Sequence, residues 1–330
     1  MNQAHAEVGG GGAAGVIRVG TRGSLLARTQ TEWVVGQLRR NGLHVEVETI
    51  STQGDRSVEA PIATIGGDGV FVRELERALL DRRIDVAVHS LKDLPTAETP
   101  GLVVSCVPVR AIPFDVLVAR EPCTLESLPA GAVVGTSSVR RVAQVKAVRG
   151  DLVVRALRGN VDTRLRRLDA GDYDCLILAG AGLERLGLAH RITQVLRPDS
   201  FWPAVSQGAL GIQIRADDER VRVALGPIDD PATHEAVRAE RACLAALAGG
   251  CLAPIGAWGR RTADGLLELG ACVLEDAGDR VTRIEAAATV AIGDPGNPSG
   301  SPEALGLRVA GMLLDRGAEA MLARARAAVR

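Results

Sequence analysis

Hydroxyl and guanidinium side chains gather where a predicted strand ends and a predicted helix begins. Residues 135–138 read Gly-Thr-Ser-Ser, and Arg140 and Arg141 follow them. Ser137 or Ser138 can cap the helix, whose first N–H groups would then point toward a ligand. Because the planar fork of an arginine matches the oxygens of a carboxylate or phosphate, this boundary predicts a binding site for a multi-oxygen anion.

Two further arginine loops follow predicted strands in the same way. Arg158 begins the run Arg-Gly-Asn after a strand expected at 152–156, and Arg22 lies in Thr-Arg-Gly-Ser after a strand expected at 16–20. In open α/β sheets, ligands bind beyond the carboxyl ends of the strands. Three such loops therefore predict a polyanion site in a cleft between two domains.

The alternative for these arginines is a solvated surface in an arginine-rich protein. Of 39 basic residues only Lys92 and Lys146 are lysines, which indicates a general preference for arginine. Residues 140–167 carry a local charge of +7, but Arg166 and Arg167 lie in a polar helix and fit this alternative. A net charge of −1 and an aromatic content of 2% argue against nucleic-acid binding through the segment.

A second candidate for chemistry is the run His-Ser-Leu-Lys-Asp-Leu-Pro at 89–95, which ends a predicted buried strand. By themselves, Lys92 and Asp93 suggest an exposed ion pair in a turn. At the rim of an arginine-lined cleft, Asp93 would instead stabilise positive charge that develops on a substrate. His89 is expected to be a hydrogen-bonded strand residue and not a catalytic base.

Cys251 lies in the run Gly-Gly-Cys-Leu-Ala-Pro, just after a helix predicted at 233–248. A cysteine in such a tight loop can be exposed, whereas Cys175 and Cys243 are expected in the core. The six cysteines include no CxxC pair, so a zinc ribbon or a disulfide framework is excluded by spacing. A cysteine hydrolase would need a histidine partner, and the nearest in sequence, His234, makes that alternative weak.

Short β-branched runs alternate with helical periods along most of the chain, which predicts sheets of largely parallel strands covered by helices. The strand after residue 208 comes so late that it is expected to return to the first sheet. The predicted elements are strands at 16–20, 44–50, 85–89, 115–119, 132–135, 152–156, 175–178 and 209–214, and helices at 24–40, 72–79, 139–148 and 161–169.

Beyond residue 227 the pattern changes to α+β. A helix at 233–248 precedes alternating runs at 255–288, which are broken by hairpin signals at 264–265 and 276–279. A final helix is predicted at about 303–329. The expected fold is two similar doubly wound α/β domains around a cleft, like those of periplasmic binding proteins, plus a smaller C-terminal α+β domain.

The expected organisation is a flexible tail and three domains. The Ala/Gly-rich tail lacks the features of a secretion signal, and no apolar run reaches the ~18 residues of a membrane span, so a cytoplasmic protein is expected. The expected boundaries are 1–15 for the tail, 16–110 with about 205–227 for the first domain, 111–204 for the second and 228–330 for the third.

Together these runs closely resemble the hydroxymethylbilane synthase (porphobilinogen deaminase) family from about residue 16 to the C-terminus. So many motifs, in order and at compatible spacing, are far more specific than any one of them. The matching segments are 21–27 with Gln30, 52–55, 69–76, 87–95, 135–141, 157–161 with Thr163 and Arg164, 178–183, 203–209 and 249–256.

The resemblance implies a transferase that condenses four porphobilinogen molecules head to tail into linear hydroxymethylbilane, with release of ammonia. It also implies a dipyrromethane cofactor, built from the substrate, on a thioether bond to Cys251. Each pyrrole ring brings two carboxylates, which accounts for an arginine-lined cleft. Relatives act as monomers, without nucleic acid or membrane.

The resemblance also implies roles for individual residues. Asp93 matches the catalytic carboxylate. Substrate binding is implied for Arg22, Arg158, Arg164 and, from its turn, Arg185; cofactor contact for Ser24, Lys92, Ser138, Arg140 and Arg141; and a place at the cleft for Phe71 and Gln207.

Two features leave room for other interpretations. The stretch 63–69 carries no lysine, whereas many relatives have basic residues in this lid, so the resemblance implies no lid contact to carboxylates here. A two-domain anion-binding protein without catalysis would use the same arginine loops, but it would need neither Cys251 nor Asp93.

Overall fold

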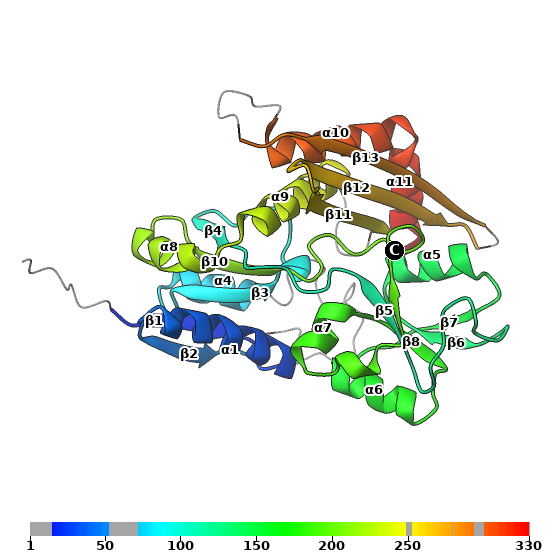
Figure 1. The fold of residues 1–330 in the computed structure, drawn as a ribbon, viewed down its shortest axis with the longest axis horizontal. Coiled ribbons are helices and arrows are strands. Elements are labelled where there is room, and N and C mark those ends of the chain that lie inside the picture. The colour runs from blue at the N-terminus through cyan, green and yellow to red at the C-terminus, as the bar shows by residue number, and fades with distance from the viewer. Residues whose placement is uncertain (1–14, 53–71, 249–252, 279, 294–299, 330) are drawn as a thin grey trace, which may run out of the picture.

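The computed structural model describes residues 15–52, 72–248, 253–278, 280–293 and 300–329. Figure 1 shows three sheets with their helices, two side by side and the third lying across them. We call the three parts the first, second and third lobe.

The first lobe holds a five-stranded sheet of order β2-β1-β3-β10-β4. β1 pairs in parallel with β2 and β3, while β10 is antiparallel to both its neighbours. Its core forms from apolar side chains such as Val19, Val86 and Ile212. The elements are β1 (Ile17–Thr21), α1 (Leu25–Arg40), β2 (Val45–Thr49), α4 (Arg73–Leu80), β3 (Val86–Ser90), a 3-10 turn (Leu91–Asp93), β4 (Leu102–Cys106), β10 (Leu210–Arg215) and α8 (Glu219–Leu225).

The second lobe repeats this plan in a sheet of order β7-β6-β8-β5-β9. Here too the fourth strand, β5, is antiparallel to its neighbours. Its elements are β5 (Asp115–Ala119), β6 (Val133–Gly135), α5 (Val139–Val148), β7 (Val153–Arg155), α6 (Val161–Asp169), β8 (Cys175–Ala179), α7 (Gly180–Arg185), a 3-10 turn (Ala189–Arg191) and β9 (Gln194–Leu196).

The third lobe is a three-stranded antiparallel sheet with helices packed on it (Figure 1). A 3-10 turn, Gly226–Ile228, leads into it. The elements are α9 (Pro231–Ala246), β11 (Ile255–Arg261), β12 (Leu267–Asp276), β13 (Val281–Val290), α10 (Pro302–Asp315) and α11 (Ala318–Val329).

The predicted fold class is confirmed: two similarly built α/β sheets and a C-terminal α+β part. The predicted return of the strand at 209–214 is also confirmed, since β10 lies between β3 and β4. The single final helix was wrong. The chain breaks after Asp315, and Gly317 has a φ of +96°, a left-handed conformation that ends a helix.

The chain crosses between the first two lobes twice, before β5 and before β10, and the two crossings touch. The Ala111 amide donates to the Gly208 carbonyl at 3.2 Å. Gly208 has a φ of +87°, and a Cβ there would lie 2.6 Å from the Ala111 carbonyl oxygen. A glycine is therefore required where the two segments pass.

Glu240 of α9 braces these crossings from the third lobe. Its buried carboxylate accepts hydrogen bonds from Arg110 at 2.6 Å, from the Ser206 amide at 2.6 Å and from the Gly259 amide at 2.8 Å. Because Arg110 and Ser206 belong to the two crossing segments, α9 fixes the third lobe to both crossings.

Candidate active site

The predicted turn follows β3 at the carboxyl end of the parallel strands. It is a 3-10 turn over Leu91–Asp93, and the Leu91 amide donates to the Ala209 carbonyl at 3.0 Å. Lys92 and Asp93 are both half-buried, and the Lys92 ammonium donates to the Gln207 side-chain oxygen at 3.4 Å. The turn is thus attached to the second crossing segment.

A buried carboxylate in the second lobe organises the paired arginines. Asp115 accepts from Arg140 Nη1 at 2.7 Å and from Arg141 Nε and Nη2 at 3.0 and 2.6 Å. It also accepts from the Gln207 amide at 3.0 Å. Burial alone would raise the pKa of Asp115, but the two guanidinium charges outweigh burial and hold this pKa well below its usual range.

The periodicity of the sequence predicts Asp115 only as the first residue of a strand. A signal was present, because an acidic residue begins an otherwise apolar run, Asp-Val-Leu-Val-Ala, and such a group requires a buried partner. Gln207, expected at the cleft, is fully buried. Its side-chain amide donates to Asp115 and its side-chain oxygen accepts from Lys92, so Gln207 connects these two residues.

Charged side chains of the first lobe and of the second lobe shift one another's pKa values. Burial lowers the pKa of Lys92 to about 8, while Asp93 raises it and Arg141 lowers it. Burial likewise lowers the pKa of Arg164 to about 10, helped by Arg141 and Arg158 and opposed by Asp93. Residues of the first lobe therefore share one electrostatic environment with arginines of the second.

The remaining predicted residues take up varied positions. Ser24 caps α1 by accepting from the Ala27 amide at 3.3 Å, and Ser138 is the N-cap residue of α5 without a capping bond from its side chain. Arg22 and Arg158 are half-buried. Arg185 donates to the Gly208 carbonyl at 2.6 Å, and burial lowers its pKa to about 10.

Two predicted residues, Phe71 and Cys251, lie outside the described residues. The described cysteines can still be compared as attachment points, since the thiolate is the nucleophile. Burial raises the pKa of Cys175, Cys243 and Cys272 to about 12, and it raises the pKa of Cys106 and Cys123 as well. Cys175 and Cys243 are core residues, as predicted.

His89 is a buried strand residue, as predicted. Its Nε2 lies 2.9 Å from the Gln213 side-chain oxygen, and the Gln213 amide donates to Glu76 at 2.9 Å. Burial, together with smaller effects of the charges of Arg22 and Arg241, lowers the pKa of His89 to about 4, against the hydrogen bond to Gln213, which raises it. The ring is therefore neutral at pH 7.

This depressed pKa makes stability depend on pH. Between about pH 6.5, where an unfolded histidine titrates, and pH 4 the unfolded chain binds the extra proton, so stability is lost as pH falls. We expect His89 to account for a loss of up to roughly 3 kcal/mol in the free energy of unfolding over this pH range. Urea unfolding should show that H89Q loses less stability between pH 7 and 4.5 than the wild type; an H190Q control, which changes an exposed histidine, should behave as wild type. Equal losses in H89Q and wild type would contradict this expectation.

The described cations fit a ligand that carries several carboxylates. Burial disfavours the charged forms of Lys92, Arg164 and Arg185, and a bound anion would offset this cost. A dipyrromethane with acidic side arms meets this requirement. Over the described part of the chain, His, Cys, Asp and Glu form no group that could hold a metal ion, and no described helix is long and apolar enough to cross a bilayer.

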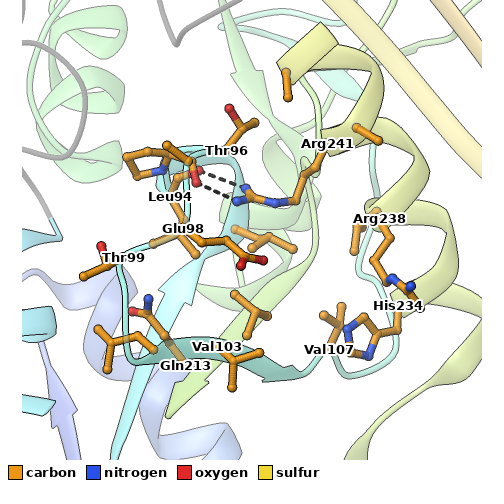
Figure 2. Close-up of a pocket in the computed structure, with 18 of the residues that line it drawn as sticks. Leu94, Thr96, Glu98, Thr99, Val103, Val107, Gln213, His234, Arg238 and Arg241 are labelled. Carbon is orange, nitrogen blue, oxygen red and sulfur yellow. Dashed lines mark hydrogen bonds between the residues drawn. The ribbon is translucent and has the colours of Figure 1, made fainter. Parts of the chain in front are cut away.

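A cavity of about 510 Å³ lies behind the Asp93 turn, between the first lobe and α9. Figure 2 shows Arg241 reaching from α9 toward Leu94 at its edge. No residue of the second lobe lines this cavity. Among its charged or titratable residues, the sequence singled out only His234, in the weak cysteine-hydrolase alternative.

Comparisons with known proteins agree along the chain. Residues 17–223 match the family model "Porphobilinogen deaminase, dipyromethane cofactor binding domain", and residues 234–315 match "Porphobilinogen deaminase, C-terminal domain". A porphobilinogen deaminase of Desulforudis audaxviator is 49% identical over 94% of this chain and 98% of its own length. One of Acidothermus cellulolyticus is 46% identical over 94% and 92%.

A solved structure of the methionine-binding protein MetQ shares 16% identity at a TM-score of 0.43, over 67% of this chain and 92% of its own. This likeness is too distant to bear on function.

Proposed function

This chain belongs to the porphobilinogen deaminase family, and from that premise we propose that Asp93 is its catalytic carboxylate and Cys251 its cofactor attachment point. The activity is the conversion of porphobilinogen to hydroxymethylbilane in tetrapyrrole biosynthesis. The observation that carries the residue assignment is the electrostatic coupling of Lys92 and Asp93 with arginines of the opposite lobe.

Asp93 is suited to accept a hydrogen bond from the N–H of the reacting pyrrole and to stabilise the positive charge on that ring. When the amino group of the aminomethyl arm leaves as ammonia, the methylene carbon stays on the ring, and the substrate becomes an electron-poor cation whose charge is shared by the pyrrole nitrogen. A fixed carboxylate beside that N–H stabilises the cation until the next ring carbon has attacked and lost its proton. Its half-buried position limits competing solvation by water.

Arg22, Arg158, Arg164 and Arg185 are proposed to bind the carboxylates of the substrate and of the growing chain. Arg164 donates from Nε to the Gly159 carbonyl at 2.7 Å, which fixes its side chain next to Arg158 in the loop after β7. A fixed guanidinium loses less entropy when it binds a carboxylate.

The dipyrromethane would be held by Cys251 and by contacts from Ser24, Lys92, Ser138, Arg140 and Arg141. When bound, it supplies the pyrrole carbon to which the first substrate ring is joined. Asp115 keeps Arg140 and Arg141 charged and oriented. The N-terminal amides of α5, which follow Ser138, add donors for an acidic side arm.

Replacing Arg158 by leucine tests its proposed binding of a substrate carboxylate. Loss of one charge-assisted contact of ~1.5–3 kcal/mol should raise KM for porphobilinogen about 10- to 100-fold. Steady-state kinetics with R166L provides the control, because Arg166 is an exposed arginine of the neighbouring α6. Equal KM values for wild type and R158L would remove Arg158 from the substrate-binding set.

A monomeric state and a cytoplasmic location are part of this proposal and rest on the family resemblance. The competing class is a two-domain anion-binding protein without catalysis, which would bind porphobilinogen and leave it unchanged. Release of ammonia from porphobilinogen by the purified protein distinguishes the two classes.

A further inference from the structure

The turn that carries Asp93 is held from two sides. On the side of its own lobe, the Leu91 amide donates to the Ala209 carbonyl at 3.0 Å and the Leu94 amide closes the turn onto Leu91 at 3.2 Å. From the third lobe, Arg241 of α9 donates to the main-chain carbonyls of Leu94 at 2.9 Å and Pro95 at 2.5 Å. Figure 2 shows both bonds.

The contact from Arg241 matters because of the space around it. The side chains of Leu91 and Leu94 are buried in a small apolar cluster with Val237 of α9. Leu94, Pro95 and Thr96 also border the cavity of about 510 Å³, so the main chain after Asp93 runs along an open space that Arg241 spans. Two hydrogen bonds from one planar guanidinium fix both the distance and the angle of the residues that follow Asp93. Pro95 also restricts the conformation of Leu94, so a fixed Pro95 transmits its position to the turn.

Helix α9 is also close in sequence to Cys251, the proposed cofactor attachment point. Glu240, adjacent to Arg241, binds both crossing segments, and Cys251 follows Arg241 by ten residues. An arginine at this point of α9 therefore ties the lobe with the proposed attachment cysteine to the turn with the proposed catalytic carboxylate.

We propose that Arg241 is a positioning residue for the reaction: through the carbonyls of Leu94 and Pro95 it sets where the Asp93 carboxylate meets the substrate. This inference rests on the proposed role of Asp93. Arg241 acts through the turn and does not touch the substrate. Since displacement of a catalytic group by about 1 Å can cost about 10²-fold in rate, its removal should affect turnover more than binding.

The test compares R241A with R238A. Arg238 lies one turn earlier on α9 and borders the same cavity, but it pairs with Glu303 of the third lobe at 2.7 and 3.0 Å. The two substitutions remove the same charge, and only R241A removes the contact with the turn. We expect R241A to lower kcat about 10- to 100-fold with KM for porphobilinogen within about twofold of wild type, and R238A to leave both unchanged.

Two further measurements separate positioning from general stability. In R241A, hydrogen exchange of the peptide that covers residues 91–96 should be at least about 10-fold faster than in R238A. R241K, which keeps a charge and a donor, should recover part of kcat. If R241A does not fold, R241Q carries the same expectations.

Several results would overturn the inference: wild-type kcat in R241A, an equal loss in R238A, or a rise in KM with unchanged kcat. D93N measured in parallel separates this failure from that of the proposed function. Wild-type turnover in D93N would remove the catalytic role on which Arg241 depends, whereas an inactive D93N beside a fully active R241A would reject the positioning role alone.

Discussion

Replacing Asp93 by asparagine should lower kcat by about 10³-fold or more while the fold is retained. The amide keeps the size of the side chain but removes the charge that stabilises the substrate cation through loss of ammonia, ring attack and deprotonation, and electrostatic and proton-transfer contributions of this kind are each worth about 10²–10⁴-fold. The measurement is hydroxymethylbilane formation under substrate saturation.

Two further variants show whether the loss of kcat in D93N comes from the missing charge at position 93. D93E keeps the carboxylate but moves it, so its rate should fall between those of D93N and wild type. D217N removes an exposed aspartate of the first lobe, whose partner is Arg82 at 3.1 Å, and should be fully active. Near-normal turnover in D93N with an unchanged circular dichroism spectrum would exclude Asp93 as the catalytic carboxylate.

Substitution of Cys251 by serine should abolish both the covalent cofactor and the activity. Intact mass spectrometry of the denatured wild-type protein should show an adduct the size of two linked pyrroles, and C251S should show the unmodified chain. A serine hydroxyl is a much weaker nucleophile than a thiolate, so the thioether has no equivalent in the variant.

The control is C123S, because Cys123 is half-buried and its loss leaves Cys251 untouched. It should keep the adduct and the activity. An active wild-type protein of unmodified mass would contradict the covalent attachment, and an adduct that persists in C251S would move it to another cysteine.

The Asp115 cluster explains why the net charge of −1 gives little information about this site. Arg140 and Arg141 are partly neutralised by the carboxylate of Asp115, whereas burial lowers the pKa values of Lys92 and Arg164. The site therefore offers two kinds of cation: arginines fixed by a buried anion, and groups that a carboxylate ligand would compensate directly.

By itself, the sequence determined the local structure and the chemistry that each loop carries. Strand and helix periods depend on neighbouring residues, so the bounds of α5 and α6 and the position of the Lys92–Asp93 turn could be read from the chain. The family motifs likewise implied roles for Asp93 and Cys251 from the sequence alone.

Only the tertiary structure decided how those loops are supported. Asp115 meets Arg140 and Arg141 across 25 and 26 residues, and Arg241 reaches Leu94 across 147. Such pairs leave no periodic signal, because the first depends on how β5 and α5 pack within the second lobe and the other on how the third lobe packs against the first. Chain folding thus gave two arginines expected to contact a ligand a buried aspartate as a partner, and brought an arginine of the third lobe to the proposed catalytic turn.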